Sequence, residues 1–495
     1  MREPRNYGQR YPVAFVDAVK AVKDHLQTEG RTMARTRNTL LASVIKETGW
    51  PQTQVAAHVV RVAAENGADE LRSVSRSHIA MWISGTRPEG VATHILCETL
   101  SRRLGRVITP EQIGLAPAEP APAMPSTWDL DTVTALVNLG DEDNMDMNRR
   151  RLLAATAYSA VGTALPPSGW WERAAEQART RRPLTPFIVS SAHVNAVREA
   201  MAFYSRQDQR LGGQAGRSAL IAYLKSDVTD YLSSRFTSEQ VRREFASAAS
   251  ELTYLAGWTA FDSSNHSKAQ KAFRVAFHLA AEADDAPLAG HILRAAAHQA
   301  VDLGHPQRAL ELAEGSVERS RYHLASPRER ALLGVVHARA LAAARRKPEA
   351  LAALRLAESD LSKAKEGGEE PARVFFFAEA SLAHETAATL RDLGDLKGAE
   401  SEFKRSVRTR ALPLAARTHA VTLGYLGDVQ ARQGQIDAAC ATWQQALDTM
   451  SGIQSGRARE VVVRMRQALS PVRGRGGSAA AELDRRARAM LRGIG

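Results

Sequence analysis

The residues with the most readily assigned chemistry lie in Val74–Ile83, which reads VSRSHIAMWI. Arg76 stands near the start of this segment, and an arginine guanidinium can fork onto the O6 and N7 atoms of guanine. Ser75 precedes it and can cap a helix, whose N-terminus favours a phosphate. The segment therefore predicts a helix that contacts DNA through Arg76; the alternative is a solvated arginine on an ordinary helix.

Two flanking elements must position this helix. Gln52–Ala57 begins a preceding helix with small residues at its middle, which lets two helices cross closely. Ser84–Pro88 predicts a turn, and a further helix with an apolar face follows it. The DNA-facing helix is expected to be held by its apolar side, which consists of Ile79, Trp82 and Ile83. This order of segments is typical of a helix-turn-helix.

Further helix boundaries can be placed before and inside this unit. Asn38 is expected to cap a helix over Thr39–Thr48, which Gly49-Trp50-Pro51 ends. The helix that begins at Gln52 is predicted to run through Ala64, and Asn66–Ser73 is predicted to form a polar loop.

Leu40–Leu104 resembles the lambda-repressor-like (XRE) helix-turn-helix domain. The resemblance rests on QTQVA at 52–56, VSRSHI at 74–79 and GTRP at 85–88. It implies that the start of the second helix reads base edges. The base-reading positions of the family correspond to Arg76, Ser77 and Met81. Its phosphate-holding positions correspond to Gln52, Ser75 and Arg87.

The chain departs from the family between its second and third helices. More than a dozen extra residues lie between Ala57 and Val74. The inserted loop can itself contact DNA, and Arg72 is its candidate residue.

The chain beyond residue 170 is almost entirely helical in pattern and contains an internal repeat. Alanines that begin the second helix of each unit recur at spacings of 40, 41, 49 and 40 residues, at Ala269, Ala309, Ala350, Ala399 and Ala439. Four residues further on are the bulky or apolar Phe273, Ala313, Leu354, Phe403 and Trp443. Twelve residues before each alanine are the small Gly257, Ala297, Ala338, Ala387 and Gly427, where two helices are expected to approach closely.

This repeat resembles a tetratricopeptide (TPR) array over about residues 245 to 450, with hairpins longer than usual. Such an array stacks hairpins into a superhelix with a concave face. Repeat position assigns to that face Arg294, His298, Arg339, His384, Arg391 and Arg432. This basic set suits an acidic peptide or a free carboxylate; the alternative is that these are ordinary exposed residues.

We expect an all-α fold in which an N-terminal helix-turn-helix domain is joined by a Pro/Ala linker to a TPR-like α-solenoid. The expected divisions are a helical arm (1–30), the helix-turn-helix domain (31–115), the linker (116–127), a helical connector with capping repeats (128–244), the repeats (245–470) and a basic tail (471–495). The tail is either a frayed solubilising segment or a nucleic-acid contact.

Composition narrows the function classes. The net charge of +12 allows a polyanionic partner. The two cysteines provide neither a disulfide framework nor a zinc set, and with no visible signal peptide or bilayer-spanning run we expect a cytoplasmic protein with no membrane partner. No nucleotide-binding or catalytic motif occurs, so we expect no enzyme activity and no cofactor. His291 and His298 are interpreted as surface histidines rather than metal ligands.

The whole chain resembles actinobacterial helix-turn-helix regulators with a C-terminal TPR domain. These are similar in architecture to peptide-responsive quorum-sensing regulators of Gram-positive bacteria, in which a peptide in the concave face shifts a dimer between DNA-binding states. The resemblance implies a transcriptional regulator of double-stranded DNA with a peptide, small ligand or protein in its TPR groove. A homodimer is expected, because one short helix offers few base contacts. The alternative is a TPR scaffold that binds a protein partner without reading DNA sequence.

Overall fold

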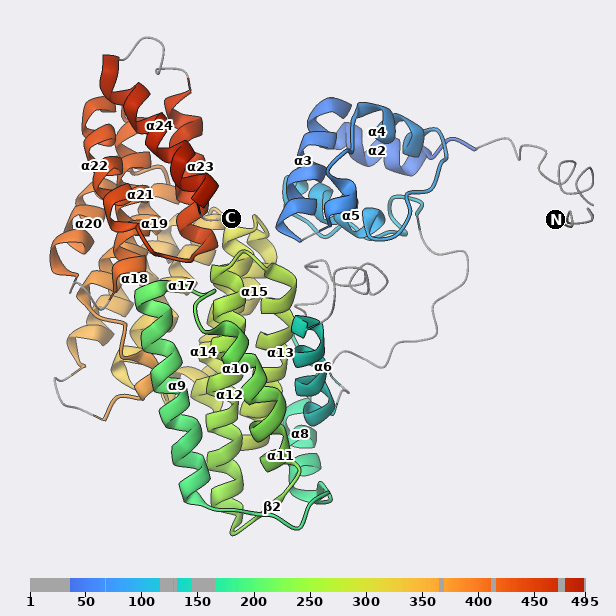
Figure 1. Cartoon of the computed structure of the whole chain (residues 1–495), viewed down its shortest axis with the longest axis vertical. Coiled ribbons are helices and arrows are strands. Elements are labelled where there is room, and N and C mark those ends of the chain that lie inside the picture. The colour runs from blue at the N-terminus through green and yellow to red at the C-terminus, as the bar shows by residue number, and fades with distance from the viewer. Residues whose placement is uncertain are drawn as a thin grey trace, which may run out of the picture.

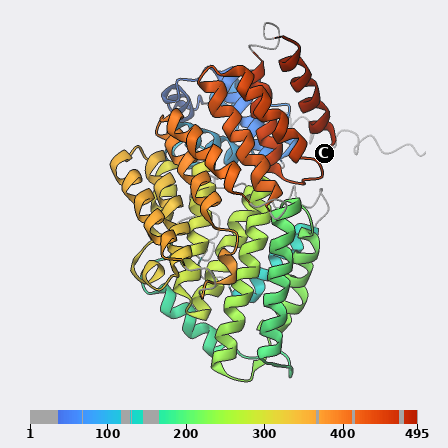
Figure 2. The same cartoon turned by 90° about the vertical axis from the view of Figure 1, so that its left-hand side faces the viewer.

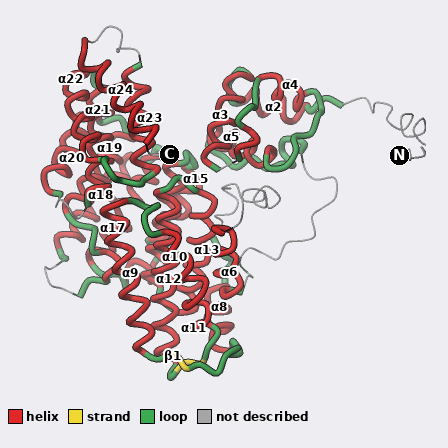
Figure 3. Tube along the Cα trace, viewed as in Figure 1, coloured by secondary structure: helices red, strands yellow, loops and turns green. Residues whose placement is uncertain are grey.

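The protein is an all-α molecule (Figures 1 and 3). The computed structural model describes residues 36–66, 68–115, 128, 131–144, 165–364, 369–410, 415–470 and 477–493. The predicted arm and the predicted linker lie outside these residues. The expectation of an all-α fold is confirmed.

The N-terminal unit contains four α-helices and one 3-10 turn. They are α2 (Thr39–Glu47), α3 (Gln52–Glu65), η1 (Asp69–Leu71), α4 (Arg76–Ile83) and α5 (Ala92–Leu104). Asn38 caps α2 by accepting the backbone N–H of Leu41 at 2.9 Å, as its sequence position predicts. Apolar side chains from all four α-helices form one core, in which Leu41, Val59, Ile79 and Leu100 are fully buried.

A connector of helices and two short strands leads to the repeats. It comprises α6 (Thr132–Asn144), α8 (Trp170–Thr180), β1 (Ile188–Val189), α9 (Ser191–Leu211), α10 (Arg217–Tyr223), the π-helical turn η3 (Leu224–Val228), α11 (Thr229–Leu232) and β2 (Arg235–Phe236). The two strands are two residues long and pair in parallel. The 21-residue α9 packs along α12 and so begins the array.

Five antiparallel hairpins form the array. They are α12 (Glu239–Asp262) with α13 (His266–Ala283), α14 (Ala286–Asp302) with α15 (Pro306–Ser316), α17 (Pro327–Ala343) with α18 (Lys347–Ser362), α19 (Glu379–Asp392) with α20 (Leu396–Thr409), and α21 (Ala416–Arg432) with α22 (Ile436–Thr449). Short elements α16 (Arg319–His323) and η4 (Ala372–Val374) lie between hairpins. The helices α23 (Gly456–Leu469) and α24 (Gly477–Gly493) follow.

The spacing of small and aromatic residues corresponds to the hairpin contacts. The five alanines that begin the second helices are all fully buried. A Cβ atom added at Gly257 would lie 2.6 Å from Cδ1 of Phe273 on the facing helix, so a larger residue would not fit. Gly427 faces Trp443 in the last hairpin in the same way. At these two positions the predicted close approach is confirmed, because each ring fills the space that a glycine leaves.

The terminal helix α24 continues the packing of the array. Ala480, Leu483 and Ala487 are buried in the same cluster as Trp443. Arg488 on its polar side donates to Asp484 at 2.8 Å. Residues 477–493 form a helix that covers the end of the array. The interpretation of the tail as a frayed segment does not fit these residues.

The two ends of the array meet. Figure 2 shows the orange and red helices of its end directly above the green helices of its start. Arg417 of α21 donates to carboxylate oxygens of Asp208 on α9 at 3.0 Å and of Asp262 on α12 at 2.7 Å. The backbone N–H of Gln454 donates to Leu211 at 2.7 Å nearby. These contacts join residues about two hundred positions apart and close the concave side of the array.

The close approach at Gly257 provides a stability test. Gly257→Ala is expected to lower the free energy of unfolding by about 1–3 kcal/mol, because the added methyl displaces Phe273. Denaturant unfolding measures this change. Gln240→Ala, an exposed substitution on the same helix, is the control and should stay within about 0.5 kcal/mol of the wild type. A stabilised Gly257→Ala variant would contradict the packing described.

Candidate functional site

The helix α4 exposes a polar face above a buried one. Ile79 is fully buried and Trp82 is 5% exposed, so these two side chains hold the helix on the domain core. Arg76 and Ser77 at its start are exposed, and Met81 is 42% exposed. The three residues to which the sequence assigned base contacts thus share the outer side of one short helix.

The start of α4 is fixed by a reciprocal cap. The backbone N–H of Ser75 donates to Nδ1 of His78 at 3.2 Å, and the Ser75 hydroxyl lies 3.0 Å from the same nitrogen. Glutamate or glutamine is the usual partner at this position of a capping box. The sequence reading assigned His78 no role. The same Ser-x-x-His arrangement begins α9 at Ser190 and His193, so the repeated motif was the available signal.

The predicted phosphate contacts surround this helix. Ser75 is its cap, Arg87 is exposed in the connection to α5, and Gln52 is the half-buried first residue of α3. The inserted segment before α4 forms η1 and is anchored by buried Leu71 and Ala68. The segment 71–88 contains three arginines and no acidic residue, so this segment carries a net positive charge.

The N-terminal unit touches the array through its other helices. Nε2 of His305, at the start of α15, lies 2.8 Å from a carboxylate oxygen of Glu98 on α5. Arg102 of α5 pairs with Glu98 at 2.8 Å and with Glu65 of α3. Burial acts to raise the pKa of Glu98, but the hydrogen bonds and charges of His305 and Arg102 hold it below its usual value. The ion pair between the unit and the array therefore lies on α5, and Arg102 connects it to α3 within the unit.

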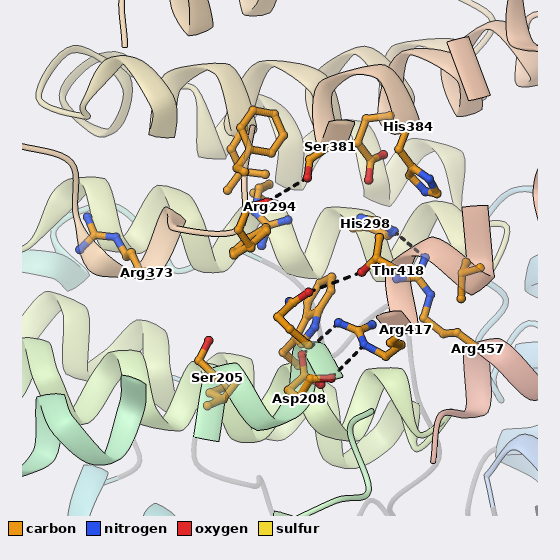
Figure 4. Close-up of a pocket in the computed structure, with 18 of the residues that line it drawn as sticks. Ser205, Asp208, Arg294, His298, Arg373, Ser381, His384, Arg417, Thr418 and Arg457 are labelled. Atoms are coloured by element: carbon orange, nitrogen blue, oxygen red, sulfur yellow. Dashed lines mark hydrogen bonds and ion pairs between the residues drawn. The ribbon is translucent and has the colours of Figure 1, made fainter. Parts of the chain in front are cut away.

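A cavity lies inside the closed array (Figure 4). It encloses about 900 Å³ of empty space, part of which opens to solvent. Helices α9, α12, α14, α17, α19, α21 and α23 all contribute lining residues. Its aromatic wall consists of Tyr254, Trp258, Phe376 and Phe377. Its arginines are Arg294, Arg373, Arg410, Arg417 and Arg457.

Three of these arginines have carboxylate partners. Arg373 donates to Glu329 at 2.7 Å and to Glu251 at 3.0 Å, and these carboxylates raise its pKa against the effect of burial. Arg417 has Asp208 and Asp262, as described above. The guanidinium of Arg457 lies 3.6 Å from a carboxylate oxygen of Asp302. These groups are charge-compensated in the way that buried ions require.

The other two arginines have only neutral partners among the described residues. Arg294 is 2% exposed, donates to the Tyr254 hydroxyl at 2.7 Å, and lies 5.6 Å from the ring centre of Trp258. Arg410 is 9% exposed and donates to the backbone oxygen of Ala380 and the hydroxyl of Ser406, both at 3.0 Å. The Nε of each arginine has no hydrogen-bond acceptor. Burial and the nearby Arg417 lower the pKa of Arg410 to about 10, although Glu385 acts to raise it.

The residues predicted for the concave face divide into three groups. Arg294, His298 and His384 line the cavity. Arg339 lies behind it and donates to His298 at 2.9 Å and to Asp302 at 3.0 Å. Arg391 pairs with its neighbour Asp392, Arg432 is exposed, and neither lines the cavity.

The histidines inside the array are buried, which corrects the surface interpretation. His291 and His298 have almost no exposure. Burial lowers the pKa of both, and it lowers the pKa of His384 to about 3, so these imidazoles are neutral. Among the described residues, no group of His, Cys, Asp and Glu side chains could hold a metal ion.

Sequence reasoning missed Arg373, Arg410, Arg417 and Arg457. Arg373 lies in η4 and Arg410 directly follows α20, so neither has a repeat-equivalent position. Arg417 and Arg457 lie at helix starts whose importance depends on contacts with the far end of the array. No local pattern marks any of the four.

Comparison with known proteins gives one match. Residues 41–116 match the family model described as the SP15 N-terminal domain. No curated protein and no solved structure is significantly similar to the chain. The match covers the four helices of the N-terminal unit and leaves the array without a named relative. None of the described helices combines the length and the apolar character needed to cross a bilayer.

The contact at Glu98 predicts how the N-terminal unit is held. Glu98→Gln removes the charge that His305 and Arg102 share and is expected to weaken the contact by about 1–3 kcal/mol. Small-angle scattering of the full chain should then show a larger radius of gyration. Glu111→Gln, an exposed substitution in the same unit, should leave the radius unchanged. Equal radii for the two variants would contradict this account of the contact.

Proposed function

We propose that this protein is a DNA-binding transcriptional regulator, whose helical array senses a peptide, small ligand or protein partner. The observation that carries the proposal is the outer face of α4. Arg76, Ser77 and Met81 are exposed there, a buried Ile79 and Trp82 hold the helix, and no carboxylate occurs between Glu70 and Glu89. A short, rigid helix with a basic approach surface is what a major-groove reader requires.

The proposal assigns the contacts by chemistry. Arg76 reads a guanine, while Ser77 and Met81 contact neighbouring base edges. Ser75, Gln52 and Arg87 hold phosphates, and such contacts position the protein without reading sequence. One helix of eight residues supplies few base contacts, so we propose that a homodimer binds a site with two-fold symmetry.

The array supplies the regulatory input. Its cavity combines an aromatic wall with Arg294 and Arg410, which have only neutral partners among the described residues. This combination suits a ligand with both acidic and apolar parts. A ligand can change DNA binding only if it binds two conformations with different affinity. The contact between His305 and Glu98 joins the array to the N-terminal unit and is where such a difference can be transmitted.

The proposal is tested by selecting genomic DNA fragments with the purified full chain at near-physiological salt. We expect an enriched two-fold motif, and Arg76→Ala should lose about 1–3 kcal/mol of discrimination at one base pair of each half-site. Arg106→Ala is the matched control, because it removes an equally charged, exposed arginine that lies outside α4.

Two outcomes would contradict the proposal. Equal effects of Arg76→Ala and Arg106→Ala on sequence preference would show that α4 does not read bases. The absence of any enriched motif, with or without the organic acids considered below, would favour the scaffold alternative.

A further inference from the structure

Two arginines that line the cavity have no carboxylate partner among the described residues, although Asp208 and Glu385 also line it. Arg373, Arg417 and Arg457 are matched by carboxylates on neighbouring helices. Arg294 is 2% exposed and Arg410 is 9% exposed. Among the described residues, neither has a carboxylate within 4 Å. A buried charge without a counter-charge is costly, so the structure lacks negative charge at two defined places.

The guanidinium groups of Arg294 and Arg410 are fixed in position and retain N–H donors that no protein group accepts. The Tyr254 hydroxyl and the Trp258 ring fix Arg294, while Ala380 and Ser406 fix Arg410. Each guanidinium has five N–H donors, and these contacts use only part of them. The Nε of each remains without an acceptor, although both side chains line the cavity.

Part of the rest of the cavity wall is apolar, although Asp208, Glu385 and several neutral polar side chains also line it. Tyr254, Trp258, Phe376 and Phe377 line it, together with Leu255, Leu332 and Val421. Arg417 of α21 reaches Asp208 on α9 and Asp262 on α12, so helices from both ends of the array meet at this cavity.

We propose that this cavity binds a compact organic anion. Its acidic groups supply the missing counter-charges at Arg294 and Arg410, and its apolar body packs on the aromatic wall. A small organic acid and the C-terminal carboxylate of a short apolar peptide share this chemistry. The role of this cavity in sensing rests on the proposed function. Binding of the anion does not, because it requires no DNA.

Binding is tested with the full chain, without DNA, by calorimetry and thermal unfolding. The probes are indole-3-acetate and octanoate, their neutral amides, inorganic phosphate, and N-acetyl-Leu-Phe as the free acid and as the C-terminal amide. We expect the organic acids to bind and to raise the unfolding midpoint, while each neutral amide binds at least tenfold more weakly. A stronger response to the peptide acid than to the small acids assigns the source to a peptide end.

Substitutions of the two arginines give the decisive readout. Arg294→Gln and Arg410→Gln should each weaken binding of the acids at least tenfold, and Arg410→Lys, which keeps the charge, should restore part of the affinity. Without ligand, Arg410→Gln should unfold at the same temperature as the wild type or higher, because it removes an uncompensated charge. A purely structural arginine would give the opposite shift. Arg432→Gln, an exposed substitution outside the cavity, should change neither property.

Several outcomes would overturn the inference. It fails if no acid binds better than its amide at millimolar concentration, or if both glutamine variants bind the acids as the wild type does. Phosphate binding as tight as that of indole-3-acetate would remove the apolar part of the proposal. If acids bind but no DNA motif is found, the proposed function fails and this inference stands.

Discussion

The interaction on which the array depends is the buried bridge of Arg417 to Asp208 and Asp262. It joins the first long helix of the array to a helix some two hundred residues later. Without it, the hairpins would present an open concave groove, as stacked repeats usually do. With it, the same residues line a cavity whose arginines are largely buried. Each of these buried arginines therefore needs a counter-charge. Among the described residues, Arg294 and Arg410 have none within ion-pair distance.

The contact with the array also determines which helices of the N-terminal unit remain available for a partner. The unit's contact with the array uses Glu98 on α5, which is held within the unit by Arg102. The helix α4 stays outside that contact, with Ile79 and Trp82 turned toward the core of the unit. A change in the array that moves His305 can alter how the unit is oriented while its core stays intact. The proposed regulation depends on this arrangement, in which the helix proposed to contact DNA is distinct from the helix that bonds to the array.

Local sequence rules predicted most of the helices, because their signals are short-range. Asn38 caps α2, Gly257 and Gly427 face aromatic rings, and the five repeat alanines are buried. The closure of the array could not be predicted, since it depends on Arg417 meeting residues from the opposite end of the chain. For the same reason the periodicity assigned Arg391 and Arg432 to the concave face but missed Arg410. His291 and His298 were placed on the surface because periodicity alone does not distinguish a helix buried on all sides.

The central claim, that α4 reads DNA while the array does not, can be tested most directly by hydrogen–deuterium exchange. The full chain would be compared with and without a DNA fragment that it selects from genomic DNA. The account predicts slowed amide exchange on DNA binding within residues 71–88 and at the start of α3, with the interior of the array unchanged. Protection confined to the array or to α24, with α4 unaffected, would contradict it.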